Sequence, residues 1–300
     1  MARRRKGFPI DGWLVLDKPG GVTSAGALAR VLALTGALKG GHAGTLDPLA
    51  TGVLPIALGE ATKTVGYVMD GTKRYRFTLR FGEARATDDA EGAVVATSPV
   101  RPDDEAIRAA LPSCGGTISQ TPPRFAALKL GGRRAYAIAR SGGDPDLAPR
   151  AVRLDEVALT GRPDADHAVF ELGCGKGFYV RAFARDLATR LGTVGHVAAL
   201  RRLAAGPFTE AQAISLDKLT GVVHSPALIE HLLPIETALD DIPALPLSDA
   251  TAARLRCGAR VPVPGTGDGP VRVVVAGRVV ALARVGGGEA QPVRVFNLQG

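Results

Sequence analysis

The chain has 300 residues, 46% of them hydrophobic, so it can form one large domain or two unequal ones with a full core. No stretch reaches the roughly 18 consecutive apolar residues that a membrane span needs, and no secretory signal follows the basic start of the chain. The three cysteines lie far apart without metal-ligand spacing, which argues against a disulfide framework or a structural zinc. We therefore expect a soluble cytoplasmic protein that makes no use of a membrane.

The charge balance points to a polyanionic partner. Lys and Arg number 37 against 29 Asp and Glu, a formal net charge of +8. Most of the cations are arginines, whose planar guanidinium group matches phosphate geometry better than an ammonium does. A basic surface kept for solubility would explain the charge equally well, so charge alone leaves nucleic-acid binding and a solvated surface both open.

Hydrophobic patterns bounded by Gly, Pro and helix-capping residues predict an alternation of strands and helices. In chain order the predicted elements are a flexible basic arm (1–10), a strand (13–17), a helix (25–34), strands (52–58, 73–81 and 92–97), a helix (103–111), strands (152–159 and 167–173), a helix (178–191) and a strand (196–203).

Two segments differ from this pattern. Residues 120–150 are rich in Pro, Gly and Arg and are predicted to form a protruding basic insertion with one helix near 133–140. After residue 240 the composition shifts, and a short helix (248–257) leads into two β runs around Ala276 and Gly277, a hairpin signal. We expect a main domain over 11–240 and a small β domain over 241–300.

The loop GGHAGTLDPLATG (40–52) places a His and an Asp between glycines, and functional residues often occupy such loops. Asp-Pro is also a common turn initiator, and spacing alone favours the turn interpretation for Asp47. The glycines match neither GxGxxG nor the Walker pattern, and GCGKGF (173–178) lacks the Ser or Thr of a P-loop. Nucleoside triphosphate chemistry is therefore disfavoured.

The string GHAGTLDPLATGVLPIALGEATK (41–63) resembles the signature block of the TruB-type tRNA pseudouridine-55 synthases. Five further blocks resemble the same family in the same order: VLDKPGGVTS (15–24), KRYR (73–76), QTPPRFAALK (120–129), GKGFYVRAFARDL (175–187) and ALRRLAAGPF (199–208). The chain departs from the family's usual residues at Phe125-Ala126, in the polar loop 83–92 and at Phe178. The resemblance covers residues 11–220.

The resemblance implies an α+β fold with a mixed, mainly antiparallel central sheet, the pseudouridine synthase fold, followed by a small C-terminal β domain of the PUA-like kind. It implies an isomerase that flips uridine 55 out of the T-arm of tRNA and converts it to pseudouridine. No cofactor and no metal are expected. The partner is tRNA, and the enzyme is expected to be a monomer that requires no protein partner.

The resemblance assigns the catalytic carboxylate to Asp47, its cationic partner to Arg181, and stacking on the target uracil to Tyr75. The carboxylate could attack C1′ or C6 or stabilise an intermediate, and the sequence does not choose between these roles. From the residues alone, a solvated Arg181 on the outer face of its helix is the alternative, although the neighbours Tyr179 and Arg185 favour a functional face. Tyr75 alone would be interpreted as a packing residue of its strand.

The remaining assignments concern RNA contacts and also follow from the resemblance. Substrate-binding residues are His42, which fills the gap left by the flipped base, Tyr179 and Leu200, which line the uracil pocket, and Lys18 and Pro19, which support the site. Phosphate contacts in the insertion are assigned to Arg124, Lys129, Arg133 and Arg134, and Arg140 can also neutralise a phosphate. Two alternatives remain open: an RNA-binding protein without catalysis, and a pseudouridine synthase with another target RNA.

Overall fold

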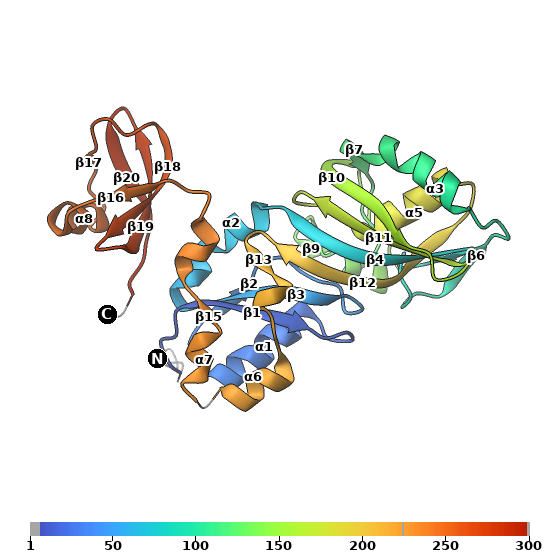
Figure 1. Cartoon of the computed structure of the whole chain (residues 1–300), viewed down its shortest axis with the longest axis horizontal. Coiled ribbons are helices and arrows are strands. Elements are labelled where there is room, and N and C mark those ends of the chain that lie inside the picture. The colour runs from blue at the N-terminus through green and yellow to red at the C-terminus, as the bar shows by residue number, and fades with distance from the viewer. Residues whose placement is uncertain (1–6, 224, 299–300) are drawn as a thin grey trace.

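An 11-stranded sheet and a separate five-stranded sheet make up most of the computed structural model, which describes residues 7–223 and 225–298 (Figure 1). The central path of the large sheet runs β14-β1-β3-β12-β4-β11-β10-β7. Its strands are β1 (Gly12–Lys18), β2 (Gly40–His42), β3 (Thr51–Leu58), β4 (Lys73–Phe81), β7 (Gly116–Gln120), β10 (Arg150–Gly161), β11 (His167–Cys174), β12 (Gly195–Ala205), β13 (Phe208–Thr209), β14 (Ile214–Ser215) and β15 (Leu232–Leu233).

The large sheet is mixed and mainly antiparallel, as expected. The pairs β1–β14 and β3–β12 are parallel, and the other neighbouring pairs of this sheet are antiparallel. The helices that accompany it are α1 (Ser24–Thr35), α2 (Val65–Asp70), α3 (Asp104–Ala110), α4 (Ala135–Arg140), α5 (Val180–Arg190), α6 (Leu216–Val222) and α7 (Ala227–Glu230). Short 3-10 turns occur at η1 (Gly59–Thr64), η2 (Leu111–Cys114), η3 (Glu210–Gln212) and η4 (Ile235–Leu239). Within the described part of the chain, no helix is long and apolar enough to cross a membrane.

An aromatic cluster fixes α5 on one face of the sheet. Phe77 of β4 stacks on Phe170 of β11 with ring centroids 5.1 Å apart, and it meets Phe183 of α5 edge-on at 6.1 Å. All three rings are buried, and each contributes about 1.5–3 kcal/mol of hydrophobic stabilisation. Because α5 is held this way, the register of its polar side chains against the sheet is fixed as well.

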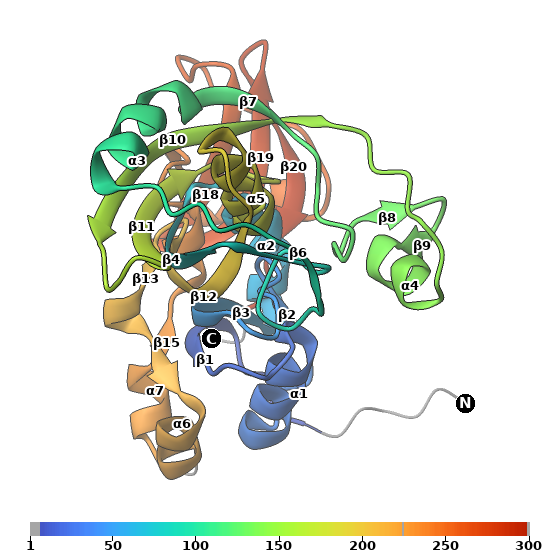
Figure 2. The same cartoon turned by 90° about the vertical axis from the view of Figure 1, so that its right-hand side faces the viewer.

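Two short hairpins project from the large sheet. One is formed by β5 (Glu83–Arg85) and β6 (Val94–Thr97), and the other by β8 (Lys129–Leu130) and β9 (Arg133–Arg134). The second hairpin and α4 form the predicted insertion, which stands out from the body of the molecule (Figure 2). The predicted helix near 133–140 is confirmed as α4.

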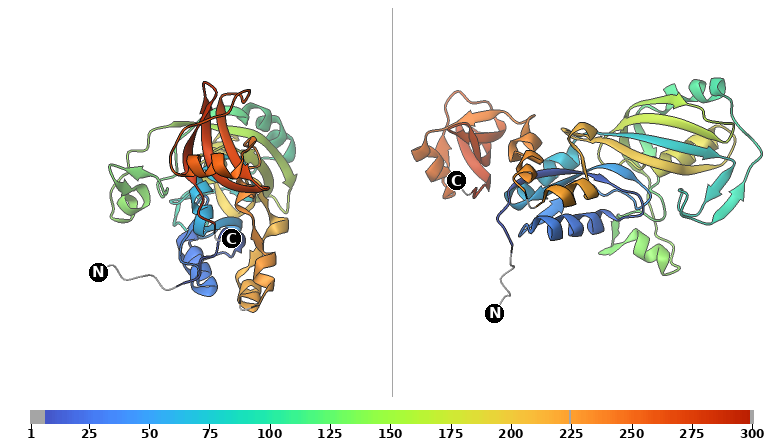
Figure 3. Two further views of the ribbon diagram at one scale, coloured as in Figure 1. Left: turned by 90° about the vertical axis from the view of Figure 1, so that its left-hand side faces the viewer. Right: turned by 60° about the horizontal axis from the view of Figure 1, so that its bottom comes forward.

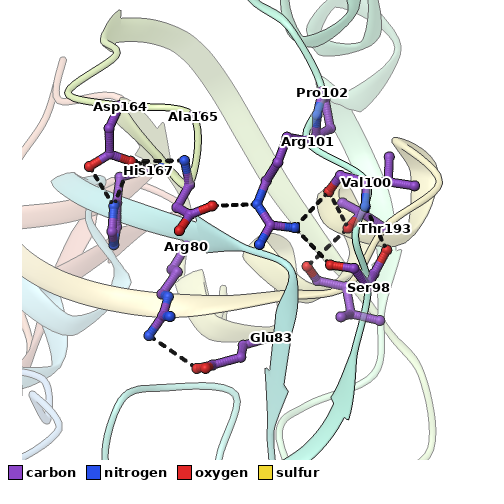
Figure 4. Close-up of polar contacts among 12 residues, drawn as sticks. Arg80, Glu83, Ser98, Val100, Arg101, Pro102, Asp164, Ala165, His167 and Thr193 are labelled. Carbon is purple, nitrogen blue, oxygen red and sulfur yellow. Dashed lines mark hydrogen bonds and ion pairs between the residues drawn. The ribbon is translucent and has the colours of Figure 1, made fainter.

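A polar cluster anchors the base of hairpin β5–β6 (Figure 4). The Arg101 guanidinium donates to the carboxylate of Asp166 and, at 2.7 Å, to the carbonyl oxygen of Ser98. The hydroxyl of Thr193 donates to the carbonyl oxygen of Val100 at 3.0 Å. The hairpin is therefore tied to the sheet on the side where it begins and ends.

The C-terminal domain is a five-stranded sheet with one helix. Its elements are β16 (Ala244–Pro246), α8 (Asp249–Arg256), β17 (Val261–Pro262), β18 (Gly269–Val275), β19 (Arg278–Gly286) and β20 (Glu289–Val295). The predicted turn between β18 and β19 is confirmed, with positive φ at both Ala276 and Gly277, the backbone of a type I′ turn.

Apolar contacts join this domain to the main one, at one end of the molecule (Figure 3). Val279, Leu282 and Phe296 belong to the same buried cluster as Trp13 and Ile235. The GEATK segment of the Asp47 block adds polar contacts to the last strand. The Lys63 ammonium donates to the carbonyl oxygen of Val295 at 2.6 Å, and Glu60 accepts from the amide of Asn297 at 2.7 Å.

The shared cluster yields a prediction for stability. Phe296→Ala should lower the free energy of unfolding by about 3 kcal/mol, because the ring is 2% exposed and its removal leaves a cavity between the domains. Val293→Ala, three residues earlier on β20 and 48% exposed, should change it by less than about 0.5 kcal/mol. Urea unfolding of the full chain measures both, and equal effects would contradict a packed interdomain cluster.

The N-terminal arm is described only in part, because residues 1–6 of it lie outside the described residues. Beyond them the chain is attached to the main domain. The amide of Phe8 donates to the carbonyl oxygen of Gly36 at 2.7 Å, and the amide of Leu38 donates to the carbonyl oxygen of Phe8 at 3.1 Å.

Candidate active site

Asp47 lies in the loop between β2 and β3, and the start of α1 holds this loop. The Ser24 hydroxyl accepts from the amide of Leu46 at 2.8 Å and donates to the carbonyl oxygen of the same residue at 3.0 Å. The amide of Gly21 donates to the carbonyl oxygen of Pro48 at 2.8 Å. The residue on each side of Asp47 is therefore fixed by the Lys-Pro turn segment.

The buried side chain of Lys18 adds a further link between the Lys-Pro turn and the Asp47 loop. Its side chain is fully buried and donates to the carbonyl oxygens of Pro19, Val22 and Pro48 at 2.8, 2.6 and 3.3 Å. Burial lowers the pKa of Lys18 to about 8, although the negative charge of Asp47 opposes the shift. Lys18 thus ties the Lys-Pro turn to the Asp47 loop, and the cation itself lies near Asp47.

We predict that Lys18→Met lowers the free energy of unfolding by about 3 kcal/mol at neutral pH, because three carbonyl oxygens lose a charged donor. The folded pKa lies below the ordinary value, so the wild type should gain stability over the variant as pH rises from about 8 towards 10.5. Urea unfolding at several pH values tests both statements. Lys176→Met removes an exposed lysine, and this control should show neither effect.

Arg202 braces the other side of the loop. Its guanidinium, 1% exposed, donates to the carbonyl oxygens of Val53 at 2.6 Å and Gly44 at 3.1 Å. At Gly52, φ is +95° and a Cβ would lie 2.3 Å from the carbonyl oxygen of Arg202, so only glycine fits there. The neighbouring Arg201 pairs with Asp17 at 3.0 Å. Both arginines of the Arg201-Arg202 pair are therefore held by contacts within the protein.

Arg181 holds Asp47 with two parallel hydrogen bonds. The Nε and Nη2 atoms donate to Oδ2 and Oδ1 at 2.8 and 3.0 Å. The same guanidinium donates to the carbonyl oxygens of Thr87 at 2.8 Å and Phe125 at 3.2 Å, and Asp89 lies 3.6 Å away. Arg181 is 4% exposed and Asp47 33%, so the cation is buried and the carboxylate remains accessible. The alternative of a solvated Arg181 is wrong.

Tyr75 and Leu200 share the sheet face on which α5 lies. Tyr75 pairs across β4–β12 with Arg202, and Phe77, two residues on, pairs with Leu200. Burial raises the pKa of Tyr75, so its phenol stays protonated at neutral pH.

Tyr179 precedes α5, and burial raises its pKa too. The side-chain amide of Gln120 fixes its backbone, with bonds of 2.8 Å to the Tyr179 amide and 3.0 Å to its carbonyl oxygen. The charge of Asp47 acts on the pKa of both Tyr75 and Tyr179, so both rings lie within electrostatic reach of the carboxylate.

A cavity of about 410 Å³ opens at Asp47. Five segments line it: the start of α1, the end of β2 with the Asp47 loop, hairpin β5–β6, the insertion and α5. The lining residues are Thr23, Ser24, Ala25, His42, Thr45, Leu46, Asp47, Pro48, Thr87, Asp89, Glu91, Phe125, Ala127, Tyr136, Arg140 and Arg181. The structure thus brings Asp47, Arg181 and His42 together around one space. The lining does not include Tyr75, Tyr179 or Leu200.

One residue of the insertion at this site, Tyr136, was not singled out in the sequence analysis. Tyr136 and Arg140 of α4 both line the cavity, and the guanidinium of Arg140 lies 5.7 Å from the centre of the Tyr136 ring. The spacing of four residues between Tyr136 and Arg140 on a basic helix is the signal that could have found Tyr136. Arg124 is half exposed and donates to the carbonyl oxygen of Gly143 at 2.8 Å. The side chains of three other predicted phosphate contacts lie outside the described structure: Lys129, Arg133 and Arg134.

Hairpin β5–β6 brings acidic residues to the site. Asp89 is buried, accepts from the amide of Glu91 at 3.1 Å and faces Arg181. Burial raises the pKa of Glu91, and the charges of Asp89 and Asp47 act in the same direction. These residues fall in the segment 83–92, which the sequence analysis described only as a polar loop. In the described residues, no group of three His, Cys, Asp or Glu side chains is placed to hold a metal ion.

Two family models match consecutive parts of the chain. The TruB family pseudouridylate synthase N-terminal domain matches residues 32–180, and the tRNA pseudouridylate synthase B C-terminal domain matches residues 181–240. The chain belongs to the TruB family of pseudouridylate synthases. The family makes it an isomerase and confirms the expected enzyme class.

Relatives of this TruB chain match it over nearly its whole length. The tRNA pseudouridine synthase B of Gluconacetobacter diazotrophicus is 55% identical, covering 98% of this chain and 100% of the relative. The tRNA pseudouridine synthase B of Caulobacter vibrioides is 50% identical, covering 99% of this chain and 100% of the relative. Among solved structures, a chain of the archaeal box H/ACA sRNP Nop10-Cbf5 complex superposes with a TM-score of 0.74 at 23% identity, covering 99% and 92% of the two chains. The expected pseudouridine synthase fold is confirmed.

Proposed function

We propose that this TruB enzyme converts uridine 55 in the T-arm of tRNA to pseudouridine, and that Asp47 is its catalytic carboxylate. The observation that carries the proposal is the two-point hydrogen bonding of Arg181 to Asp47 at the wall of a 410 Å³ cavity. The names of the relatives supply the RNA class. We further propose that the enzyme acts in the cytoplasm as a monomer and requires no protein partner.

The reaction breaks the N1–C1′ bond, turns the uracil and joins C5 to C1′. The proton of C5 is lost and N1 gains one, so oxidation state and atom count are unchanged and no redox partner takes part. Asp47 acts as an ionised carboxylate, either as a nucleophile at C1′ or C6 or as a charge that stabilises an intermediate. Its accessible oxygens face the cavity while Arg181 fixes their orientation.

A uridine within a folded loop cannot reach this cavity unless it leaves the base stack, at a cost of a few kcal/mol. His42 lines the cavity beside Asp47, which suits a side chain that occupies the vacated space. Tyr75, Tyr179 and Leu200 are proposed to receive the uracil on the sheet side of Asp47. The insertion, with Arg124, Lys129, Arg133 and Arg134, and the PUA-like domain over 241–300 are proposed to contact phosphates.

The test uses unmodified tRNA and an isolated T-arm stem-loop, with pseudouridine mapped at single-nucleotide resolution. Wild-type enzyme should modify position 55 in both, because the site reads a local RNA shape. A stem-loop with cytidine at the target position is the control. Modification at another uridine alone would replace the proposed target, and tight binding without product would favour an RNA-binding role.

His42→Ala should reduce the rate on both RNAs by about 10- to 100-fold, because the flipped state loses the side chain that fills the gap. The fold should be kept, since His42 lies at the wall of an open cavity. Single-turnover rates at saturating enzyme measure the effect. A rate equal to wild type on both RNAs would remove His42 from the flipping step.

A further inference from the structure

Two arginines one turn apart on α5 each contact both hairpin β5–β6 and the insertion. Arg181 donates to the carbonyl oxygens of Thr87 and Phe125. Arg185 donates to the Asp88 carboxylate at 2.8 Å and to the carbonyl oxygen of Thr121 at 3.0 Å. The tip of the hairpin and the root of the insertion are therefore joined twice through one helix. The catalytic proposal uses the first joint, through Arg181, and leaves the second without a role.

The tip of the hairpin is itself fixed against the sheet. The amide of Val197 on β12 donates to the carbonyl oxygen of Asp88 at 3.0 Å, and the amide of Ala90 donates to the carbonyl oxygen of Val197 at 3.0 Å. Arg185 thus connects a rigid point of the sheet to Thr121, where the insertion leaves β7. The far part of the insertion reaches the cavity through Tyr136 and Arg140.

Asp88 occupies its position at a cost to the fold. Its φ is +60°, a conformation that glycine adopts more easily than other residues. Burial raises the pKa of Asp88; Arg185 and Arg181 oppose this shift, and Asp186 adds to it. The raised pKa means that folding disfavours the ionised form of Asp88. Replacing Asp88 by a residue with a neutral side chain should therefore leave the protein at least as stable at neutral pH.

We propose that Arg185 and Asp88 are positioning residues that fasten the root of the insertion to the tip of hairpin β5–β6 and so hold the RNA-gripping segment over the Asp47 cavity. Two observations fit this role. The Asp88 carboxylate lies where it does not help folding, and it pairs with Arg185, which also holds the insertion. The inference rests on the proposed function, because the segment must grip RNA for its position to matter.

The test compares Arg185→Ala, Arg185→Lys, Asp88→Asn and Asp88→Gly with wild type on the T-arm stem-loop. Arg185→Ala and both Asp88 variants should raise KM by about tenfold, with single-turnover rates at saturating enzyme within about threefold of wild type. Arg185→Lys should recover part of the loss, since an ammonium still reaches one acceptor. The double variant Asp88→Asn with Arg185→Ala should be no worse than Arg185→Ala, as coupled residues are non-additive.

Asp186→Asn is the matched control. Asp186 also accepts from Arg185, at 3.0 Å, but it contacts neither the hairpin nor the insertion through that bond, so KM should not change. Thermal melting of Asp88→Asn and Asp88→Gly should give midpoints equal to or above that of wild type. A KM increase that only follows a loss of stability, or an unchanged KM in Arg185→Ala, would overturn the proposal.

Amide hydrogen exchange of the free protein separates this inference from the proposed function. Residues 121–128 should exchange faster in Arg185→Ala than in wild type or Asp186→Asn, with no RNA present. If the wild type makes no pseudouridine, the proposed function fails, and the exchange result still decides whether Arg185 fastens the insertion. Equal exchange in all three proteins would show that it does not.

Discussion

Asp47→Asn is expected to abolish pseudouridine formation while leaving the fold and tRNA binding largely intact. The amide keeps the shape of the side chain and can still accept a hydrogen bond from Arg181, but it carries no negative charge. A nucleophile or charge stabiliser is then lost, and the rate should fall by about a thousandfold or more, equivalent to about 4 kcal/mol. Release of tritium from tRNA containing [5-³H]uridine measures the activity.

Asp17→Asn provides a closely matched control for this experiment. Asp17 accepts from both terminal nitrogens of Arg201 at 3.0 and 3.1 Å, and its side chain is 36% exposed, close to the value for Asp47. It lies outside the cavity lining, so Asp17→Asn should keep activity near wild type. If Asp47→Asn retained activity comparable with this control, the catalytic assignment would be wrong.

Local sequence patterns predicted the elements whose structure depends on local chemistry. The alternation of KRYRFTLRF placed β4 over the same residues that the structure gives, Lys73–Phe81. Ala276 and Gly277 marked the turn of the C-terminal hairpin. Thr23, a helix-capping residue type directly before α1, caps that helix by accepting from the amide of Gly26 at 3.0 Å. In each case the signal lies within a few residues of the feature.

Elements without such a signal were missed. β7, GTISQ, is short and mostly exposed, and β20 contains a proline and charged residues, so neither has the apolar alternation of a buried strand. β7 ends the path of the large sheet, and β20 lies between β19 and the two-residue strand β17. Both form because a neighbouring strand offers hydrogen-bond partners. That partner is a long-range feature, which a local pattern does not contain.

The site could be predicted only through the family resemblance. Arg181 and Asp47 are 134 positions apart, and spacing alone favoured a turn for Asp47 and allowed a solvated Arg181. Arg202 shows the same limit, because its burial depends on carbonyl oxygens of β3 and the Asp47 loop. In the sequence, the acidic residues of hairpin β5–β6 look like part of a solvated connection, because the arginines that pair with them lie far along the chain on α5. Buried charges are placed by tertiary partners.

Arg181→Lys should reduce turnover by about 100-fold or more, despite keeping the charge. The guanidinium serves four oxygen atoms at once: two of Asp47 and the carbonyl oxygens of Thr87 and Phe125. An ammonium has three donors in a different geometry and loses the planar two-point grip, a loss of about 3 kcal/mol in charged hydrogen bonds. Single-turnover kinetics on tRNA at saturating enzyme isolates this effect from binding.

The same substitution should also loosen the site around Asp47. Thr87 at the hairpin tip and Phe125 at the insertion root share the buried donor, so losing it should make both segments more mobile. Arg76→Lys is the control, because Arg76 donates twice to Glu171, at 2.9 and 2.7 Å, but is exposed. That variant should keep its rate within about threefold, as surface ion pairs contribute little. If Arg181→Lys were equally mild, the orientation of Asp47 would not depend on the two-point contact, and the carboxylate would have to be held by its loop alone.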